Sequence, residues 1–335
     1  QNLVYDYCAG YQYKDSTIVG FSHTHFSGTG HSDLGDILIM PYTGETKINP
    51  GTSTEPEKGY RSRYSHDTEK AHPGYYEVRL KDNNILAQLT ATKRTGIHKY
   101  TYPNSKDQKF LLDLSHGIYN YDGKVLWSRI NVINDTLITG YRITNGWSAE
   151  NYIYFAISLS KPIKEYGYQD LQKPKYNGFR GRFNVHKNFP EIIGRKVVAF
   201  FELEDDNTNN LTIKVALSAV STNGAIKNLM EEAIAYSFEE LKSMAENSWE
   251  EALSIFEIEG NNDQIDMFYT SLYHTMINPS IYMDVDGSYR GVDHNIHKAT
   301  NFTNYTVFSI WDTYRALHPL MNIINPSKNI DFINS

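Results

Sequence analysis

The sequence of 335 residues predicts a mixed, multi-domain fold in which an antiparallel β-sandwich is followed by an α-helical domain. Two observations lead to this prediction. Apolar residues alternate with polar ones from Asp36 to about Val220, and from Asn223 onward they recur at steps of three and four. Alternation is typical of half-buried strands, whereas the longer step places one apolar stripe along a helix. We therefore expect a sandwich over residues 1–222, linker helices over 223–260 and a helical domain that begins over 261–335.

The sheet-forming part contains a clear hairpin signal. Apolar residues at 76, 78 and 80 alternate with charged ones, a polar turn follows at 82–84, and alternation resumes at Ile85. Turns of the Asn-Gly and Asp-Gly type at 145–146 and 122–123 separate other runs of this kind, which is typical of an antiparallel sandwich. Six further strands are expected at Phe110–Leu114, Val125–Ile133, Leu137–Thr144, Tyr152–Leu159, Lys196–Leu203 and Leu211–Val220.

Helical spacing begins after the change of period. The first long helix is expected over about 238–256, and a second, with apolar residues at 265, 268, 272 and 276, ends before Pro279. A loop or short β segment then leads to a third helical pattern at about Ile310–Ile323, and another helix begins near Asp331. Three helices cannot bury their own apolar faces well. We therefore expect the helical domain to be incomplete in this chain.

Composition excludes several classes of protein. With 40% hydrophobic and 21% charged residues the chain is globular rather than disordered. A net charge of −7 argues against a nucleic-acid binder, which needs a basic face. Eleven acidic residues and one lysine lie between Glu231 and Asp266, as expected for a solvated helical face. No apolar run is long enough to cross a membrane, and a single cysteine, Cys8, allows neither a disulfide framework nor a cysteine-based metal site.

The densest group of polar side chains lies at Gly20–His31, followed by Asp33 and Asp36. In an extended chain His23 and His25 would point the same way and could share a metal ion. Neighbouring histidines are more often hydrogen-bonding loop residues, and both interpretations stay open at this point. The glycines at 28 and 30 let the backbone approach a ligand closely, but the strand and helix that flank a phosphate-binding loop are not indicated.

A second group lies on the third helical pattern. Asp312 and Arg315 are three residues apart and can pair on one helix face, while Trp311 can offer its ring to a ligand. On spacing alone, an ion pair beside a core tryptophan is the default interpretation. Asp284 and Asp286 resemble a calcium loop only superficially, because the EF-hand spacing is absent.

Five blocks, taken together, resemble glycoside hydrolase family 92, the calcium-dependent exo-acting α-mannosidases of glycan-degrading bacteria. The first is close to the hallmark of that family, and the other four follow in the family's order. The blocks are GFSHTHFSGTGHSDLGDILIMP (20–41), SRYSHDTEKAHPGYYEVRL (62–80), ATKRTGIHKYTYP (91–103), FYTSLYHTMINPSIYMDVDGSYRG (268–291) and FSIWDTYRALHPLMNIINP (308–326). The resemblance therefore spans nearly the whole chain.

The resemblance implies an N-terminal β-sandwich joined through helices to an (α/α)6-barrel, which is truncated here, with the active site between them. It also implies hydrolysis with inversion, in which a carboxylic acid protonates the leaving oxygen and a carboxylate activates water. In that family a calcium ion contacts the mannose hydroxyls at the −1 subsite, and oxygen ligands suit such an ion.

Two groups of site residues follow from the resemblance on the sandwich side. Phe21, Ser22 and His23 of the hallmark segment would reach into the mannose pocket. Gly74 and Tyr75 belong to a second loop of the family pattern and would support substrate binding there.

On the helical side, the resemblance implies that Trp311, Asp312 and Arg315 line the same pocket, with Asp312 near the calcium ion through a water molecule. This shifts the preferred interpretation of that cluster from structure to function. The family's catalytic acid and base come from a part of the domain that would lie beyond residue 335, so neither can be named in this chain.

The expected function is the release of mannose from α-mannosides, most directly α-1,2 linkages of N-glycans or mannans, by a protein of the bacterial periplasm or cell surface. The expected partner is a mannose-containing glycan, and the oligomeric state is open. One alternative is a non-catalytic carbohydrate-binding protein, because the 26 tyrosines and 4 tryptophans would suit a surface that binds sugars. Another is an inactive fragment that lacks the catalytic acid and base. A third is a metallohydrolase that holds zinc with the histidine cluster.

Overall fold

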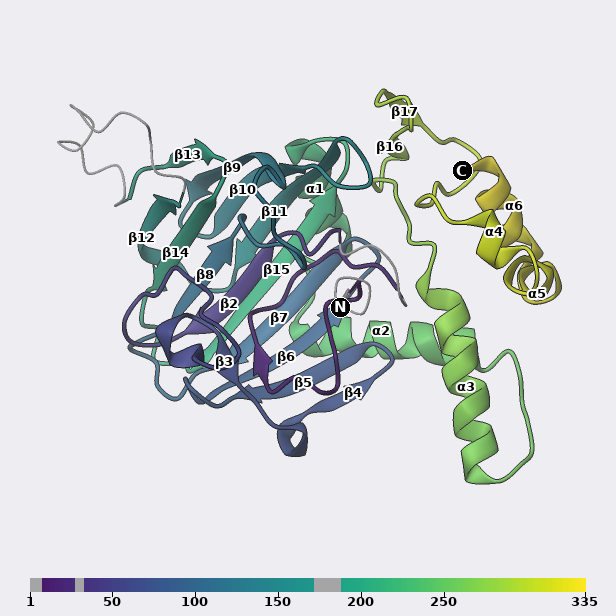
Figure 1. The fold of residues 1–335 in the computed structure, drawn as a ribbon, viewed down its shortest axis with the longest axis horizontal. Coiled ribbons are helices and arrows are strands. Elements are labelled where there is room, and N and C mark those ends of the chain that lie inside the picture. The colour runs from purple at the N-terminus through teal and green to yellow at the C-terminus, as the bar shows by residue number, and fades with distance from the viewer. Residues whose placement is uncertain (1–7, 28–32, 172–187) are drawn as a thin grey trace.

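The computed structural model describes residues 8–27, 33–171 and 188–335. A sheet-rich N-terminal part is followed by a helical C-terminal part, and the helices α3 to α6 extend to one side of the sheets (Figure 1). In the described residues no helix is long and apolar enough to cross a membrane.

Two antiparallel sheets form the N-terminal part. The larger has the strand order β13-β9-β10-β11-β15-β7-β6-β5-β4, and the smaller β12-β14-β8-β2. The larger sheet contains β13 (Glu191–Gly194), β9 (Val125–Asn134), β10 (Leu137–Thr144), β11 (Asn151–Leu159), β15 (Asn210–Ser218), β7 (Thr95–Thr101), β6 (Ile85–Ala91), β5 (Tyr75–Leu80) and β4 (Lys70–His72). The smaller sheet contains β12 (Ile163–Asp170), β14 (Val197–Leu203), β8 (Lys109–Asp113) and β2 (Leu38–Tyr42), and β1 (Thr17–Ile18) pairs separately with β3 (Ser62–Arg63).

The two sheets share one apolar core, to which both contribute buried side chains. The predicted hairpin is confirmed: Leu80 faces Ile85 in the antiparallel register of β5 and β6, and alternate residues such as Val78 are fully buried. All six of the further predicted strands are present with small shifts of their ends. The antiparallel sheets inferred from the period-two pattern are therefore confirmed.

Several strands were not predicted, and each has a physical reason. β2 is buried at all five positions, so its sequence is continuously apolar and lacks alternation. β7 carries the polar His98 and Lys99 in its centre, and β12 is mostly polar, with its buried positions confined to Gly167 and Tyr168. Strands of this kind cannot be separated from loops by periodicity alone.

Two helices cover the outer face of the larger sheet. α1 (Thr222–Glu232) and the start of α2 (Phe238–Leu253) form a second apolar cluster with that face. The buried members of this cluster are Tyr75, Ile97, Ala156, Ala216, Ala225, Leu229, Ala233, Phe238 and Leu241. Side chains cap both helices, because the Ser221 hydroxyl accepts from Gly224 N, and Ser237 and Glu240 form a capping box. α1 was missed in the sequence, where its polar residues and Gly224 hide the apolar stripe.

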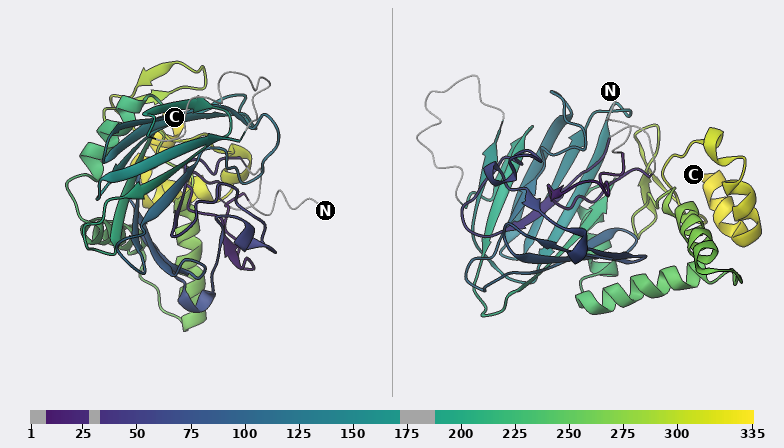
Figure 2. Two further views of the ribbon diagram at one scale, coloured as in Figure 1. Left: turned by 90° about the vertical axis from the view of Figure 1, so that its left-hand side faces the viewer. Right: turned by 60° about the horizontal axis from the view of Figure 1, so that its bottom comes forward.

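The remaining helices and a small hairpin form the C-terminal part (Figure 2). α3 (Asn262–Ile277) contacts α2 through Trp249 and Tyr273, whose ring centroids are 4.7 Å apart. The hairpin of β16 (Ser288–Arg290) and β17 (Ile296–Lys298) follows, and then come α4 (Ile310–Thr313), α5 (Leu317–Ile324) and α6 (Pro326–Asn334). The single helix expected over 310–323 was wrong: the backbone leaves helical geometry at Ala316, where φ is −139°, and splits it into α4 and α5.

The packing of α1 on the sheet leads to a first prediction. Leu229 is 2% exposed, so replacing it by alanine should lower the free energy of unfolding by about 2–5 kcal/mol, through lost apolar burial and the cavity left behind. Met230 on the same helix is 57% exposed and serves as the matched control, where alanine should change stability by about 0.5 kcal/mol or less. Equal effects in chemical denaturation would contradict this packing.

Candidate functional site

The hallmark segment, defined here as residues 20–27, runs beside the chain that enters β2. Phe21 N donates to Ile39 O at 2.8 Å and Ile39 N donates back to Phe21 O at 3.0 Å, while His23 N donates to Asp36 O at 2.9 Å. The Phe21 side chain is 8% exposed and belongs to the sandwich core. The segment is therefore an integral edge of the sheet structure.

A buried ion pair lies beneath this segment. Arg142 of β10 donates from Nη1 to Asp36 Oδ1 at 2.8 Å, and the two residues are 0% and 1% exposed. The same guanidinium reaches the carbonyls of Gly35 and His116. Asp36 also accepts from the Thr24 hydroxyl at 2.6 Å. One buried carboxylate thus links the hallmark segment to a central strand of the larger sheet.

The backbone around this carboxylate is in a rare conformation. Leu34 and Ile37 have φ values of 68° and 55°. A β-branched residue such as isoleucine is rarely found in the left-handed region, and such positions cost about 1–3 kcal/mol and persist only where the surroundings enforce them. The ion pair of Asp36, between these two residues, supplies that enforcement.

The histidines of the segment are engaged in hydrogen bonds. His23 Nδ1 lies 2.6 Å from Ile37 O and His23 Nε2 lies 2.8 Å from His98 Nε2, so both ring nitrogens are used. His25 Nε2 lies 2.7 Å from Ser22 Oγ. Burial lowers the pKa of His23 to about 4, which keeps it neutral near pH 7. Residues 28–31, with Gly28, Gly30 and His31, lie outside the described residues.

These contacts do not favour a zinc site in the hallmark segment, because His23 has no nitrogen left to offer a metal. Among the residues that the structure describes, no group of three histidine, cysteine or acidic side chains could hold a metal ion. The histidines act here as hydrogen-bonding loop residues.

Gly74 and Tyr75 lie where the larger sheet meets α2. Gly74 has φ of +87°, and a Cβ atom there would lie 2.9 Å from Glu246 N, so the close approach of α2 requires glycine. The Tyr75 hydroxyl donates to Glu77 at 2.7 Å, and the ammonium of Lys242 lies 4.0 Å from the ring centroid. In this part of the chain both residues join elements to one another.

The second predicted group lies on and after α4. Trp311 is 81% exposed, so it is not the core tryptophan expected from spacing. Arg315 follows the end of α4, and its Nε donates to the Tyr314 hydroxyl at 3.0 Å. No ion pair joins Asp312 to Arg315, and no contact joins this group to the hallmark segment, within the described ranges. Both side chains remain open to solvent.

A set of contacts that the sequence did not indicate ties the two parts together. Arg94, in the turn after β6, forms an ion pair with Glu232 of α1 at 2.5 Å and donates to Met283 O. Asp284, 3% exposed, accepts from Ser218 Oγ and from the Asn228 side-chain amide, each at 2.8 Å. We call Arg94, Glu232, Asn228, Asp284 and Ser218 the interdomain clasp. It anchors the loop after α3 to the end of the sandwich.

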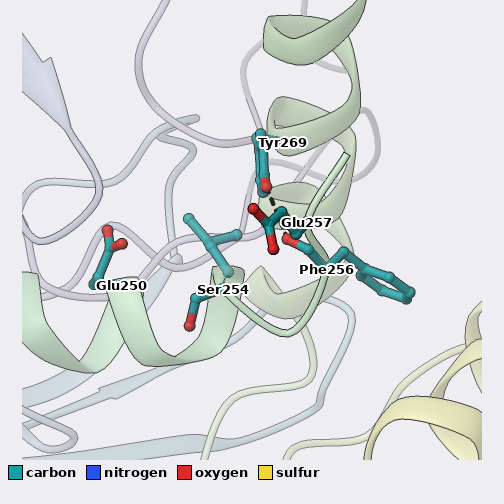
Figure 3. A pocket seen from close by; sticks show the side chains of 6 residues that line it. Glu250, Ser254, Phe256, Glu257 and Tyr269 are labelled. Carbon is teal, nitrogen blue, oxygen red and sulfur yellow. Dashed lines mark hydrogen bonds between the residues drawn. The ribbon is translucent and has the colours of Figure 1, made fainter. Parts of the chain in front are cut away.

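Two surface hollows flank α2, and neither is lined by a predicted site residue. The first, of about 460 Å³, lies at the turn from α2 to α3 and is lined by Glu250, Leu253, Ser254, Phe256, Glu257 and Tyr269 (Figure 3). The Tyr269 hydroxyl donates to Phe256 O at 2.8 Å and closes one side of it. The second, of about 370 Å³, extends from Glu250 to His72 and Pro73. Neither hollow is lined by the hallmark segment or by the Trp311 group, and the second only borders Gly74, so we do not assign the chemistry to them.

Comparison with known families decides where this chain belongs. The sequence model described as "Glycosyl hydrolase family 92 N-terminal domain" matches residues 2–218, and that of the "Glycosyl hydrolase family 92 catalytic domain" matches residues 224–335. The chain belongs to glycosyl hydrolase family 92. The resemblance in the five blocks is therefore confirmed, and the two models meet between the end of β15 and the first turn of α1.

Solved structures of the family give the same result. The family GH92 α-mannosidase BT3965 from Bacteroides thetaiotaomicron, in complex with mannoimidazole, superposes with a TM-score of 0.90 and 42% identity over 99% of this chain and 42% of its own. The inverting mannosidase BT2199 from the same organism has a TM-score of 0.76 and 26% identity, over 97% of this chain and 42% of its own.

A curated relative from Arthroderma benhamiae, named an uncharacterized secreted glycosidase, is 24% identical over 82% of this chain and 37% of its own length. The chain thus spans about two fifths of the length of the relatives that it matches.

The buried ion pair leads to a second prediction. In Arg142→Met the similar volume is kept but Asp36 loses its partner, so the free energy of unfolding should fall by about 3–5 kcal/mol. The Arg129–Glu191 pair is about 38–39% exposed and provides the control, where Glu191→Gln should cost about 1 kcal/mol or less. Urea titration measures both. An Arg142→Met protein as stable as the wild type would show that the pair does not hold the turn.

Proposed function

We propose that the complete polypeptide carrying this chain is an inverting, calcium-dependent exo-α-mannosidase. Its expected substrates are α-mannosides, with α-1,2 linkages of N-glycans or mannans as the first choice. The observation that supports this most is the 42% identity, over almost the whole chain, with an α-mannosidase solved with mannoimidazole. Inversion is supported by the inverting mannosidase BT2199, at 26% identity.

The domain arrangement proposed for the complete protein follows the family. The sandwich of residues 1–222 and the linker of 223–260 would precede an (α/α)6-barrel that starts at 261 and continues past residue 335. The catalytic acid and base would come from that later part. In this arrangement the interdomain clasp would fix the barrel against the end of the sandwich.

The geometry refines the proposed roles on the sandwich side. Phe21 and His23 are held by the core and by hydrogen bonds, so they would shape the mannose pocket rather than bind through a free polar atom. Ser22, partly exposed and hydrogen-bonded to His25, is the member best placed to meet a sugar hydroxyl. Gly74 and Tyr75 would contribute indirectly by seating α2.

On the helical side, Trp311, Asp312 and Arg315 would line the pocket. An exposed indole suits the apolar face of a sugar ring, and the N–H groups of the exposed Arg315 guanidinium suit its hydroxyls. All three residues are exposed in the described chain. This agrees with a role in which they contact a substrate or a further part of the protein.

Calcium is proposed from the family resemblance. The described residues could supply only part of the set of ligands that such an ion needs. Calcium takes six to eight oxygen ligands, and the described residues offer no cluster of three acidic or histidine side chains. Asp312 would therefore act through water, with the remaining ligands supplied by the longer polypeptide. When bound, the ion would contact mannose hydroxyls and favour a distorted ring.

A secreted location, in the periplasm or at the cell surface of a bacterium, is proposed on two grounds. The natural substrates named above lie outside the cytoplasm. The relative from Arthroderma benhamiae is described as secreted.

The deciding experiment is mannose release from α-1,2-mannobiose by the full-length polypeptide. We expect release with inverted anomeric configuration, loss of activity with a chelator and recovery when calcium is added back. A folded full-length protein that releases no mannose from any α-mannoside, but binds mannose in calorimetry, would instead indicate a carbohydrate-binding protein.

The role of Asp312 has its own test. In the full-length enzyme Asp312→Asn should lower kcat/KM for the mannobiose by about 10- to 100-fold and weaken activation by calcium, as expected when an outer-shell ligand is removed. Asp135→Asn, in the exposed turn between β9 and β10 of the sandwich, is the matched control and should leave both unchanged. Near-normal kinetics for Asp312→Asn would exclude the assigned role.

A further inference from the structure

A chain of three hydrogen bonds runs from the core to the hallmark segment. The Tyr100 hydroxyl lies 2.7 Å from His98 Nδ1, His98 Nε2 lies 2.8 Å from His23 Nε2, and His23 Nδ1 lies 2.6 Å from Ile37 O. His98 and Tyr100 lie on β7 and are 3% and 0% exposed. We call these four groups the histidine relay.

The chemistry of the relay fixes the direction of every hydrogen bond. A backbone carbonyl only accepts, so His23 must carry its proton on Nδ1. When that ring is neutral its Nε2 is a bare acceptor, and His98 must donate from its own Nε2. His98 Nδ1 then accepts, and the Tyr100 hydroxyl donates to it.

Protonation of His23 would disrupt this arrangement. His23 Nε2 would then donate, so His98 would have to shift its proton to Nδ1, and Tyr100 would become an acceptor. The Tyr100 hydroxyl makes no other hydrogen bond in the described part of the chain, so its proton would be buried without a partner. Burying an unsatisfied donor together with a positive charge is costly, so the neutral relay is strongly preferred.

We infer that His98 is a positioning residue: by donating its Nε2 proton to the bare Nε2 of His23, it satisfies the Nδ1–H tautomer that the Ile37 carbonyl selects and thereby seats the hallmark segment on β7 while both rings are neutral. This role concerns the folded protein itself and does not depend on the mannosidase activity proposed above.

The seat is built for this ring. A Cβ atom on Gly96 of β7 would lie 2.7 Å from His23 Cδ2, so only glycine leaves room for the imidazole. The Phe21 ring packs against the other side of the pair, 6.2 Å from the His98 ring centroid. Gly96 and the Phe21 ring therefore bound the space that the two imidazoles occupy.

The surroundings determine how the relay responds to acid. The titratable or charged groups around the pair are His25 from the hallmark segment, Tyr100 from β7, and Asp36, which is neutralised by Arg142. A positive charge on His25 opposes protonation of His23. No acidic side chain contacts either ring directly among the described residues, so nothing compensates a charge placed on the relay.

The sign of the pH dependence follows. Burial lowers the pKa of His23 from 6.5 to about 4 and that of His98 well below 6.5. Between these values the unfolded chain binds more protons than the folded one, so the stability contributed by the relay is complete above about pH 6.5 and is lost as the pH falls towards 4. Acidification should therefore release the hallmark segment.

The test uses protein labelled with ¹⁵N in its histidines. At neutral pH the side-chain spectra should show His23 protonated on Nδ1 only and His98 on Nε2 only, assigned with the single variants. Free histidines favour the opposite tautomer to that of His23, so this pattern reports the hydrogen bonds of the relay. His23 found as the Nε2–H tautomer, or charged at neutral pH, would overturn the inference without any variant.

Two variants separate a directed hydrogen bond from simple filling of space. The side-chain amide of His98→Gln can reach the place of Nε2 and still donate to His23, whereas that of His98→Asn reaches only the place of Nδ1. We expect the glutamine variant to keep the amide hydrogen exchange rates of residues 21–24 and the hydrogen-bonded ¹⁵N shift of His23 Nε2. The asparagine variant should give faster exchange at residues 21–24 and an Nε2 shift without a hydrogen bond, while the Ile37 carbonyl keeps the proton on Nδ1 in both variants. Identical His23 spectra and identical exchange in both variants would refute the positioning role. Gly96→Ala should displace the ring and give the exchange pattern of the asparagine variant.

Discussion

A single buried carboxylate, Asp36, anchors the end of the sandwich that carries the hallmark segment. Asp36 sits between two residues with left-handed backbone geometry, accepts from Thr24 of the hallmark segment and pairs with Arg142 in the centre of the larger sheet. Removed from water, such a charge must be fully paired, so the position of Arg142 dictates where the turn after the segment can run. The hallmark segment, the strained turn and β2 therefore have one common anchor, and the path of each depends on it.

The two halves of the proposed pocket differ in how firmly they are held. On the sandwich side the hallmark segment is fixed by backbone pairing, the buried ion pair and the histidine relay. On the helical side Trp311 and Asp312 stand exposed on the short helix α4. The interdomain clasp connects these halves: Arg94 and Asp284 fix the loop after α3 to the sandwich end. Preorganisation of the sugar site would thus begin at the sheet and reach the helices through the clasp.

The sequence predicted the sheets well because a half-buried strand must alternate, and it predicted α2 and α3 because each carries a long apolar stripe. It missed β2, because a strand buried at every position does not alternate. It also missed the break at Ala316, because the apolar spacing continues across it. For the site, the family blocks point to the hallmark segment and to α4, and the roles of their residues stay predictions. They could not show that Asp36 meets Arg142, or that His23 meets His98, because these pairs are separated by 106 and 75 residues and form only once the sheet is assembled. His98 does lie in one of the five blocks, which was the available signal.

The packing of α1 on the outer face of the larger sheet limits which recombination events this fold can accept. The two family models meet between the end of β15 and the first turn of α1, yet this helix and the first turn of α2 complete the outer face of the larger sheet, where Leu229 belongs to the same apolar cluster as Ala156 and Ala216. α1 packs on β11 and β15, the strands that carry these alanines. A recombination event at that junction would pair one lineage's sheet with another lineage's helix, and the two surfaces would no longer match. Because the two surfaces pack together, we expect the sandwich and α1 to be exchangeable only as one unit, and a substitution on either surface to need a compensating one on the other.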